Sequence, residues 1–363
     1  MSDAIVIGGG PGGSTAAWLL ARAGRDVTVL EAARFPRVKL CAGWVTPAVW
    51  RALELDPGEY PHTIQPFSEA SLAIDGRCYD TRWSHPASYG IIRCEFDDFL
   101  LRRAAGVGAT VHLEARVRSV ERGGSGVTVH TTDNRRFLAP VILGAGGHHC
   151  PVARAFGQVA PDEAVVLTRE SETRVGAGRL RRWTDRYGTP ELFAEPDLRG
   201  YGWYFTKGDF LNLGIGCIGT GRDLHRRCDA LLDRLRSDGR LPTHAKLEPM
   251  RGHAYAVHGR TSRRVAGDRF LLIGDAAGLA RMISGEGIGP AVASARLAVE
   301  ALLASERRAP TDYARALAAR FRVRAAPLLG PLPPRILEAV GRVVCRTPLL
   351  RRKLVFEGAF GMG

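Results

Sequence analysis

Apolar residues near the start of the chain occur first in a short run and then in a helical pattern. Residues Ala4–Ile7 form an apolar, β-branched run that predicts a buried strand, and Val27–Leu30 form a second one. Between them, Ala17, Leu20 and Ala21 recur at the spacing of one helix face. The order strand, helix, strand predicts a βαβ unit with parallel strands.

The rest of the chain shows further runs of both kinds. Short β-branched runs separated by turn residues cover residues 109–138, and aromatic and β-branched runs cover residues 160–255. These runs predict strands, and the second group predicts a mainly antiparallel sheet. An apolar strand at 270–273 precedes a helical pattern at 287–303, and the chain beyond 309 is helical and basic.

A glycine-rich turn joins the first strand to the helix. Gly8, Gly10 and Gly13 have the G-x-G-x-x-G spacing. The first glycine permits a tight turn, the second admits a pyrophosphate to the backbone, and the third lets helix and strand pack closely. Because the helix N-terminus would hold the phosphates, we also assign Pro11 and Gly12 to this site. The turn therefore predicts a dinucleotide-binding site.

An acidic residue ends the second strand. Glu31 occupies the position where a carboxylate accepts a hydrogen bond from the adenosine ribose 2′-hydroxyl, and we expect Glu31 and Ala32 to contact the cofactor. This stretch alone does not separate FAD from NAD. A second nucleotide-type strand at 270–273 favours FAD, because a simple dehydrogenase does not need it. Arg93 precedes a predicted helix at 95–105 and is a candidate for the FAD phosphates, although a solvated arginine fits equally well.

These patterns predict an α/β chain in which one domain is interrupted by another. We expect a discontinuous, Rossmann-like FAD-binding domain, an inserted, mainly antiparallel β-sheet substrate domain and a short C-terminal helical tail. The chain of 363 residues is long enough for this organisation. The predicted boundaries are residues 1–65, 90–158 and 256–308 for the FAD-binding domain, 66–89 and 159–255 for the substrate domain, and 309–363 for the C-terminal helical region.

The chain carries a net charge of +14 that comes mostly from arginine. Arginines spread over solvated faces explain this charge without any partner. A sharper interpretation is a surface that contacts an anionic membrane or an acidic electron-donor protein. No basic stretch is interleaved with aromatic residues, so we do not expect nucleic-acid binding. The sequence leaves the oligomeric state open.

Apolar runs and cysteines indicate the compartment. No apolar run approaches the roughly 20 residues of a membrane span, and the N-terminus has no basic signal region, so we expect a cytoplasmic protein with or without peripheral membrane contact. The seven cysteines contain no C-x-x-C pair, which predicts neither a disulfide framework nor a zinc site. His148 and His149 lie in a stretch that we expect to be extended, with the two side chains on opposite faces, so no metal site is predicted.

Three later segments resemble a known flavoprotein family. The stretch FLLIGDAAGLARMISGEGIG, which begins at 270, is similar to the second FAD-binding motif of the superfamily that includes p-hydroxybenzoate hydroxylase-type monooxygenases and geranylgeranyl reductases. RVKLCAGWVTP, at 37–47, resembles the segment of geranylgeranyl reductase-like proteins whose cysteine lies by the flavin. GYGWYFTKGDFLNLGIG, at 200–216, resembles the strand that lines their substrate cavity. Together these segments and the FAD framework extend the resemblance over most of the chain.

The resemblance implies roles for residues of the second motif. Asp275 would bond the ribitol or ribose beside the flavin, and residues 285–288 would open a helix whose N–H groups point at the flavin. A helix N-terminus there stabilises negative charge on the reduced ring. Val117 would contact adenine through its backbone. The other cofactor-binding residues implied in this motif are Gly274, Gly285, Gly287 and Ile288.

Four residues are candidates for contact with the reacting groups. The resemblance makes Cys41 a candidate proton donor beside the flavin, although a free cysteine is often only a small buried apolar residue. Trp44, Tyr201 and Trp203 are candidates for an aromatic slot over the flavin or around the substrate, whereas an ordinary aromatic core fits the same pattern. By strand alternation, Tyr201, Trp203 and Phe205 share one face.

Three charged residues have simpler explanations. Glu286 fits an acid at a helix N-terminus, and its implied place near the flavin keeps it among the catalytic candidates. Lys207 and Asp209 are expected to be turn residues at the end of a strand.

The chain departs from the family pattern at three positions. Gly146 stands where many relatives have the aspartate of G-A-D-G, which leaves open how NAD(P)H would approach. Ala42 replaces the first glycine after the cysteine, and Thr206 replaces a proline of the cavity strand. The C-terminal helical region is also short, which affects how a long lipid would be held.

The residues and the resemblance together predict an FAD-dependent oxidoreductase. The predicted reaction is hydride transfer from reduced flavin to a C=C bond of a largely apolar, isoprenoid-like substrate, with NAD(P)H or reduced ferredoxin as the electron donor. One alternative is an FAD-dependent monooxygenase or halogenase-like enzyme of secondary metabolism, although the W-x-W-x-I-P stretch of halogenases is missing. A second alternative is a flavoprotein with structural FAD and a membrane- or partner-binding role.

Overall fold

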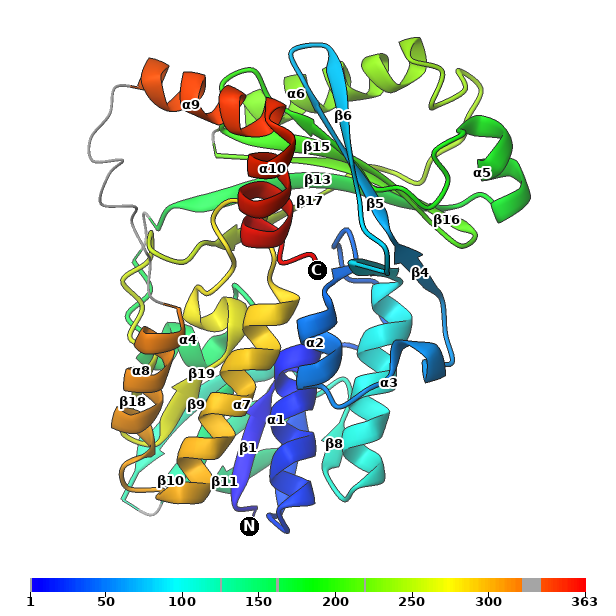
Figure 1. The fold of residues 1–363 in the computed structure, drawn as a ribbon. Coiled ribbons are helices and arrows are strands. Elements are labelled where there is room, and N and C mark those ends of the chain that lie inside the picture. The colour runs from blue at the N-terminus through cyan, green and yellow to red at the C-terminus, as the bar shows by residue number, and fades with distance from the viewer. Residues whose placement is uncertain (1, 125, 161–162, 219, 322–333) are drawn as a thin grey trace. The chain divides into compact units, whose positions relative to one another are not determined.

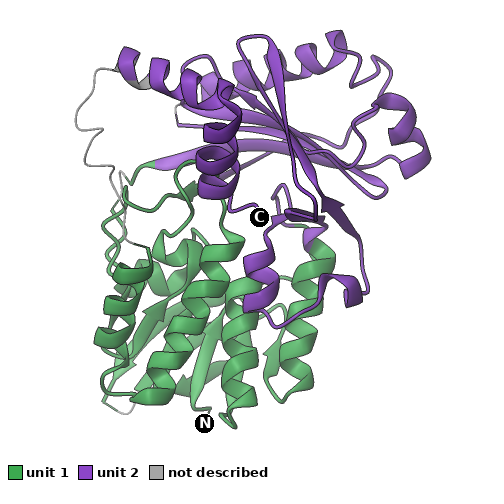
Figure 2. Cartoon of the chain, in the orientation of Figure 1, with its two compact units in different colours: residues 1–38, 94–164, 255–323 green, residues 39–93, 165–254, 324–363 purple. Residues whose placement is uncertain are grey.

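The computed structural model divides the chain into two compact units, which Figure 2 colours separately. The predicted C-terminal helical region includes residues 322–333, which lie outside the described residues. The structure describes residues 2–124, 126–160, 163–218, 220–321 and 334–363. Unit 1 comprises residues 1–38, 94–164 and 255–323, and unit 2 comprises residues 39–93, 165–254 and 324–363.

Unit 1 is built on a six-stranded sheet with the order β18-β19-β12-β1-β2-β8. From β19 through β12, β1 and β2 to β8, neighbouring strands are parallel. At one edge, β18 pairs with β19 in the antiparallel direction. Every residue of β1 and β2 is buried, as expected for parallel strands covered on both faces. The strands are β1 (Ala4–Ile7), β2 (Val27–Leu30), β8 (Thr110–His112), β12 (Val141–Gly144), β18 (Ala266–Gly267) and β19 (Phe270–Leu272).

Helices pack on this sheet, and a small second sheet completes unit 1. Helices α1 and α7 lie side by side although they are far apart in the sequence (Figure 1). The helices are α1 (Pro11–Arg22), α3 (Arg93–Gly106), α4 (Pro151–Phe156), α7 (Ile288–Ala304) and α8 (Ala309–Arg320), with the 3₁₀ helix η2 (Gly274–Ala277). The small sheet has the order β11-β10-β9, with β9 (Val117–Gly123), β10 (Gly126–Thr131) and β11 (Arg136–Ala139).

Unit 2 is built on a seven-stranded sheet with the order β17-β13-β16-β15-β14-β5-β6. Its described pairs are antiparallel except for β5 and β14, which run parallel. The strands are β5 (Glu69–Ile74), β6 (Arg77–Arg82), β13 (Val165–Arg174), β14 (Glu191–Ala194), β15 (Gly200–Lys207), β16 (Phe210–Cys217) and β17 (Arg251–Ala256). A three-stranded sheet, β3 (Trp44–Val45), β7 (Ser88–Ile91) and β4 (Ile64–Phe67), lies in the same unit.

Unit 2 also contains helices, and, like the shorter α5, helix α6 was not predicted from the sequence. Leu224, Cys228, Leu231 and Leu235 form its buried stripe, and a capping box of Thr220 and Asp223 starts it. Among the described residues, no helix has both the length and the apolar composition needed to cross a membrane. The helices are α2 (Pro47–Ala52), the 3₁₀ helix η1 (Pro57–Glu59), α5 (Ala177–Trp183), α6 (Gly221–Ser237), α9 (Pro334–Arg346), α10 (Pro348–Leu350) and the π-helix η3 (Arg351–Ala359).

The architecture confirms the predicted fold class. A Rossmann-type α/β unit is interrupted by a mainly antiparallel sheet, and the chain beyond 309 is helical where it is described. Asp75 and Gly76 form the hairpin turn between β5 and β6, where both residues have positive φ.

Candidate functional site

The loop between β1 and α1 has the geometry of a phosphate-binding turn. Gly8 has φ +103°, and a Cβ on Gly13 would lie 1.9 Å from the Gly8 carbonyl oxygen, so neither position admits a side chain. Gly10 is the N-cap of α1 and supplies no side-chain cap, and Pro11 follows it. The first N–H groups of α1 therefore have no side-chain cap at the positive end of the helix, where phosphate oxygens bind.

The Glu31 carboxylate is held rigidly at the end of β2. It accepts a hydrogen bond from the Gly9 N–H at 2.7 Å and another from the Ala33 N–H at 2.8 Å. Each carboxylate oxygen can accept a further bond, so the carboxylate keeps capacity for ribose hydroxyls. Ala32, which lies between Glu31 and Ala33 in the sequence, is exposed.

An arginine that the sequence analysis did not select lies beside the same turn. A Cβ placed on Gly10 would have one neighbouring atom within 4 Å, namely Arg37 Nη2 at 3.6 Å. Arg37 Nη1 lies 3.1 Å from Oδ2 of the buried Asp97. A fixed guanidinium here favours an anionic ligand. Arg37 stands at the start of the RVKLCAGWVTP segment, but nothing in that pattern shows where the side chain lies.

The second motif packs directly against the first. A Cβ on Gly12 would lie 2.8 Å from Cγ2 of Ile273, the residue that follows β19. Asp275 lies in η2, and a Cβ on Gly287 would lie 3.1 Å from its Oδ1, so the Asp275 carboxylate faces the start of α7. Gly287 is the N-cap of α7 and supplies no side-chain cap. Two uncapped helix N-termini, those of α1 and α7, are thus brought into one unit by segments far apart in the chain.

A buried ion pair supports the second motif. Arg263 donates from Nη1 to the carbonyl oxygens of Asp275 and Ala276, at 3.0 Å each. Its Nε and Nη2 bond the Glu163 carboxylate at 2.7 and 2.5 Å, and both side chains are buried. Nη2 also lies 3.1 Å from His148 Nδ1. Burial, and then the Arg263 charge, lower the pKa of His148, so the neutral imidazole can accept this bond.

The loop after β12 explains a departure from the family pattern and corrects one prediction. A Cβ on Gly8 would lie 2.9 Å from Gly146 Cα, and a Cβ on Gly146 would lie 3.3 Å from Cys150 Cα, so Gly146 allows a close approach of two loops. His148 and His149 form a turn with ring centroids 4.8 Å apart, and the prediction of an extended stretch with opposed side chains was wrong. No cluster of three metal-ligating side chains occurs in the part of the chain that the structure describes.

Glu286 has a partner within unit 1. Its Oε2 lies 2.8 Å from Arg281 Nε, and the carboxylate lies close to the N-terminus of α7. Burial raises the pKa of Glu286, while the Arg281 charge opposes this shift. The ion pair gives Glu286 a structural role and leaves its catalytic role a proposal.

The residues of unit 1 fit a dinucleotide cofactor. Two uncapped helix N-termini, a cradle that a Cβ would fill, a fixed carboxylate and a fixed guanidinium match the phosphates and hydroxyls of FAD. Val117 begins β9, and Arg93 is a buried residue that begins α3 at the edge of unit 2. The predicted cofactor residues that lie in unit 1 are Gly8, Gly10, Pro11, Gly12, Gly13, Glu31, Ala32, Val117, Gly274, Asp275, Gly285, Gly287 and Ile288.

The Cys41 loop belongs to unit 2, where a buried lysine anchors it. Lys207 has no exposed side-chain surface, and its Nζ donates to the carbonyl oxygens of Ala42 and Ile91 at 2.9 Å each and to Glu172 Oε2 at 2.6 Å. All three ammonium hydrogens therefore have acceptors. Lys207 does end a strand, but its prediction as a turn residue was wrong because its side chain points into the protein.

A buried asparagine connects the same loop to the aromatic strand. Asn212 accepts a hydrogen bond from Trp203 Nε1 at 2.7 Å. It donates from Nδ2 to Glu172 Oε2 at 3.2 Å and to the Cys41 carbonyl oxygen at 3.4 Å. Asn212 and Glu172 were not predicted as site residues. For Asn212 a signal exists, because a polar residue inside the apolar run FLNLGIG indicates a buried polar contact.

A buried carboxylate, that of Glu170, lies close to the Cys41 backbone. Glu170 and Glu172 share a face of β13, and Glu170 is buried. Burial raises the pKa of Glu170 to about 7, although the Lys207 charge and a hydrogen bond to the Cys41 backbone oppose the shift. Glu170 can therefore gain and lose a proton near neutral pH, which makes it a proton-carrying group that the sequence analysis did not find.

The predicted aromatic candidates lie together on one side of the sheet. Trp44 has its ring centroid 5.0 Å from that of Phe205 and 5.3 Å from that of Phe360, and the Tyr201 ring lies 5.6 Å from Phe360. Trp203 and Phe205 are almost fully buried, as in a core, whereas Trp44 and Tyr201 keep partial exposure. The buried Nε1 of Trp44 has no acceptor among the described residues, which indicates a place for a ligand oxygen.

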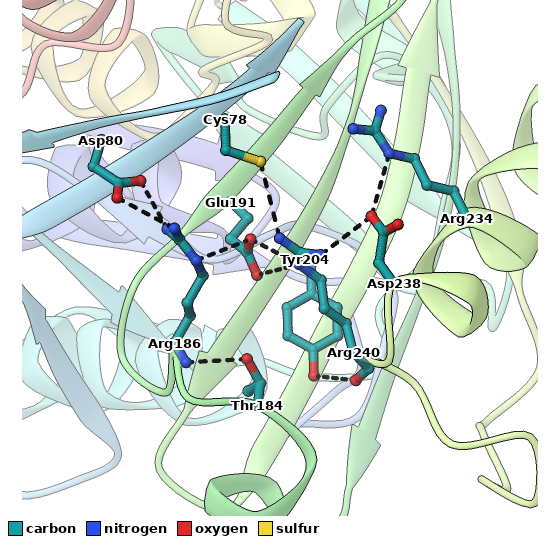
Figure 3. Close-up of polar contacts among 9 residues, drawn as sticks. All are labelled: Cys78, Asp80, Thr184, Arg186, Glu191, Tyr204, Arg234, Asp238 and Arg240. Atoms are coloured by element: carbon teal, nitrogen blue, oxygen red, sulfur yellow. Dashed lines mark hydrogen bonds and ion pairs between the residues drawn. The ribbon is translucent and has the colours of Figure 1, made fainter. Parts of the chain in front are cut away.

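The other side of the same strands carries a polar network with a structural role (Figure 3). Arg240 Nε bonds both oxygens of the buried Glu191, at 3.1 and 2.9 Å, and the Tyr204 hydroxyl donates to the Arg240 carbonyl oxygen at 3.0 Å. Arg186 forms a two-point pair with Asp80 at 2.7 and 3.2 Å. The charges of this network are paired with one another, so the aromatic side is the candidate for substrate contact.

Comparisons with known proteins give a family match and several similar enzymes. The family model described as FAD binding domain matches residues 1–319. A menaquinone reductase of Mycolicibacterium smegmatis is 31% identical over 380 residues, which cover 96% of this chain and 89% of that protein. The chloroplastic geranylgeranyl diphosphate reductase of Oryza sativa subsp. japonica is 28% identical over 82% of this chain and 66% of that protein.

Solved structures share the fold. A geranylgeranyl bacteriochlorophyll reductase-like protein of Thermoplasma acidophilum superposes with a TM-score of 0.77 at 18% identity, over 97% of this chain and 98% of that one. A myxobacterial chondrochloren halogenase superposes with a TM-score of 0.70 at 22% identity, over 95% of this chain and 90% of that one. At these identities the likeness concerns the fold alone.

Proposed function

Because this chain belongs to the FAD binding domain family and is an oxidoreductase of that family, we propose that it reduces a C=C bond of a largely apolar, isoprenoid-like substrate. FAD, when bound, supplies hydride chemistry for such a reduction. The observation that carries the proposal is the similarity to a menaquinone reductase over 96% of the chain, together with the similarity to a geranylgeranyl diphosphate reductase.

The residues of unit 2 suit the second half of such a reduction. Addition of hydride to a C=C bond leaves a carbanion that must receive a proton. We propose Cys41 as the group that gives this proton and Glu170 as the buried acid that restores it. Lys207 and Asn212 act as positioning residues, because they bond the carbonyl oxygens of Ala42 and Cys41, respectively. The partly exposed Trp44 and Tyr201 offer an apolar surface to the substrate.

The monooxygenase or halogenase alternative has weaker support. The relatives named above that are similar in sequence over most of the chain are reductases, whereas the halogenase is 22% identical and shows only the fold. NAD(P)H and reduced ferredoxin are both proposed as electron donors. The net charge of +14 favours an acidic donor protein, and anaerobic titration with NADH, NADPH and reduced ferredoxin separates these sources.

The test uses the holoenzyme, reduced with dithionite in the absence of oxygen. Mixing with a menaquinone or with geranylgeranyl diphosphate should restore the absorbance of oxidised flavin and give a product whose isoprenoid chain, rather than its quinone ring, has gained two hydrogens. Cys41→Ala should slow this step, whereas the exposed Cys78→Ala should not. If the product instead acquires ¹⁸O from labelled oxygen, the protein is a monooxygenase. If the reduced protein reacts with neither probe nor oxygen, its FAD is structural.

A further inference from the structure

Exposed apolar side chains are concentrated near the C-terminus. The described residues include eleven large apolar side chains that are exposed, and six of them fall within residues 336–354. Isolated exposed apolar residues are common on protein surfaces, but a contiguous group of them marks an interaction site. These six residues, which we call the C-terminal stripe, are Ile336, Val340, Val343, Leu349, Leu350 and Leu354.

Three residues of the C-terminal stripe lie on one face of α9, and another face of this helix is fixed to unit 2. Ile336, Val340 and Val343 are spaced i, i+4, i+7 and therefore share one face of α9. On the remaining circumference, Cys345 packs into the aromatic cluster, and a Cβ on Gly341 would meet Leu198. The stripe therefore faces away from the core of unit 2.

Hydrogen bonds hold this segment in place. Arg346 lies 2.8 Å from Asp75 Oδ2, and Arg342 donates to the Pro196 carbonyl oxygen at 2.8 Å. The buried Arg351 donates to Thr81 Oγ1 at 3.1 Å. The exposed apolar face is thus part of an anchored element rather than a frayed end.

The charge of the segment indicates the kind of partner. Residues 334–363 contain six Arg and Lys and only two Glu, so the segment carries a net positive charge. Arg335 is exposed beside Ile336, and Arg346 and Lys353 are exposed while paired with Asp75 and Glu357. A helix with a narrow apolar face, a basic polar face and low overall hydrophobicity lies in the plane of a lipid interface. A second copy of the chain is a poorer partner, because two chains of net charge +14 repel one another.

We propose that the C-terminal stripe docks on the surface of an anionic phospholipid bilayer, with α9–η3 parallel to the membrane plane. The stripe enters the boundary between headgroups and acyl chains, while the basic side chains remain at the headgroups. This inference rests on the surface of unit 2 and does not depend on the proposed reductase activity.

The test is flotation of the FAD-loaded, full-length protein with vesicles of phosphatidylcholine and phosphatidylglycerol, without electron donor or isoprenoid. The wild type should float with mixed vesicles, and less so with phosphatidylcholine alone or at high salt. The triple variant Val340→Ser, Val343→Ser, Leu354→Ser should bind at least about tenfold more weakly. Arg335→Gln should weaken binding about fivefold, which corresponds to about 1 kcal/mol.

A matched control replaces exposed apolar residues of unit 1. Val107→Ser with Leu303→Ser should leave flotation unchanged, and FAD content should be equal in all variants. Equal flotation of the triple variant and the wild type would overturn the proposal. The proposal would also be overturned by a wild type that does not float but forms a dimer in light scattering, if the triple variant cannot form that dimer. The stripe would then bind a second copy of the chain. Because flotation needs no turnover, it tests membrane binding even if the reductase proposal fails.

Discussion

The ammonium group of Lys207 donates to the carbonyl oxygen of Ala42 at 2.9 Å, from a side chain with no exposed surface. Burial of a lysine is costly unless its charge is paired and its hydrogens are bonded. Glu172 supplies the opposite charge at 2.6 Å, and Ile91 supplies a second carbonyl oxygen. The strand that carries the aromatic candidates is therefore tied to the loop that carries Cys41, which joins the proposed proton donor and the proposed substrate surface in one cluster.

Removal of the ammonium group should destabilise unit 2. Lys207→Met leaves Glu172 without its cation and two carbonyl oxygens without a donor, so we expect a loss of about 3 kcal/mol in the free energy of unfolding. The double variant with Glu172→Gln should recover part of this loss, because no unpaired charge remains. Urea unfolding at neutral pH measures both values. The exposed Lys246→Met is the control, and a loss for Lys207→Met as small as that of the control would contradict the role given to Lys207.

Burial of Glu170 predicts a pH dependence of stability. Its pKa is raised to about 7 from 4.5, so between these pH values the folded protein holds a proton that the unfolded chain has released. The stability due to this proton is fully present below pH 4.5 and is lost as the pH rises through about 7. The shift corresponds to about 3 kcal/mol. Because Glu170→Gln stays neutral, its unfolding free energy relative to wild type should rise by this amount across the window.

The measurement is chemical denaturation at several pH values for wild type, Glu170→Gln and the exposed Glu59→Gln. The Glu59 variant should follow the wild-type curve. Parallel curves for wild type and Glu170→Gln would show that Glu170 titrates alike in the folded and unfolded chains.

Local spacing explains what the sequence could predict. The turn at Gly8 to Gly13 is encoded by residues five positions or fewer apart, so the pattern reveals both the strand and the helix. Helix α6 was missed because only four of its residues are buried and the rest are mostly charged. The parallel pairing of β5 with β14 also escaped prediction, since nothing in either strand names its partner.

Polar contacts between distant segments were the least predictable part of the site. Lys207 bonds Ala42 and Ile91, and Arg263 bonds Glu163, across separations that no periodic pattern records. The sequence showed only that Lys207 ends an apolar strand, where a turn residue and a buried cation look alike. Burial decides between them, and burial follows from the tertiary packing.

Gly13 should be essential for cofactor binding. A Cβ in Gly13→Ala would lie 1.9 Å from the Gly8 carbonyl oxygen and would push the turn away from α1, so we expect FAD binding at least about tenfold weaker, or about 1.4 kcal/mol. The FAD content of the purified protein and its dissociation constant are the measurements. Gly106→Ala is the control, because open space surrounds Gly106. A Gly13→Ala protein that carries a full complement of FAD would disprove the assignment of this turn.

Arg263 should affect both stability and FAD binding, because it holds the second motif from inside unit 1. Arg263→Met leaves Glu163 buried without a cation and frees the carbonyl oxygens of Asp275 and Ala276, so we expect a loss of about 4 kcal/mol in unfolding free energy and weaker FAD binding. Arg263→Lys keeps the charge but cannot match the fork of bonds, and it should be intermediate. Arg264→Met, next to it on the surface, is the control.

The two readouts for Arg263 separate a role in the fold from a role in holding the motif. A purely structural residue would lower the stability of the FAD-free and FAD-loaded protein equally, so the gain in stability on adding FAD would stay as in wild type. If Arg263 positions Asp275, that gain should shrink in Arg263→Met and recover partly in Arg263→Lys. An unchanged gain in Arg263→Met would show that the second motif keeps its shape without this side chain.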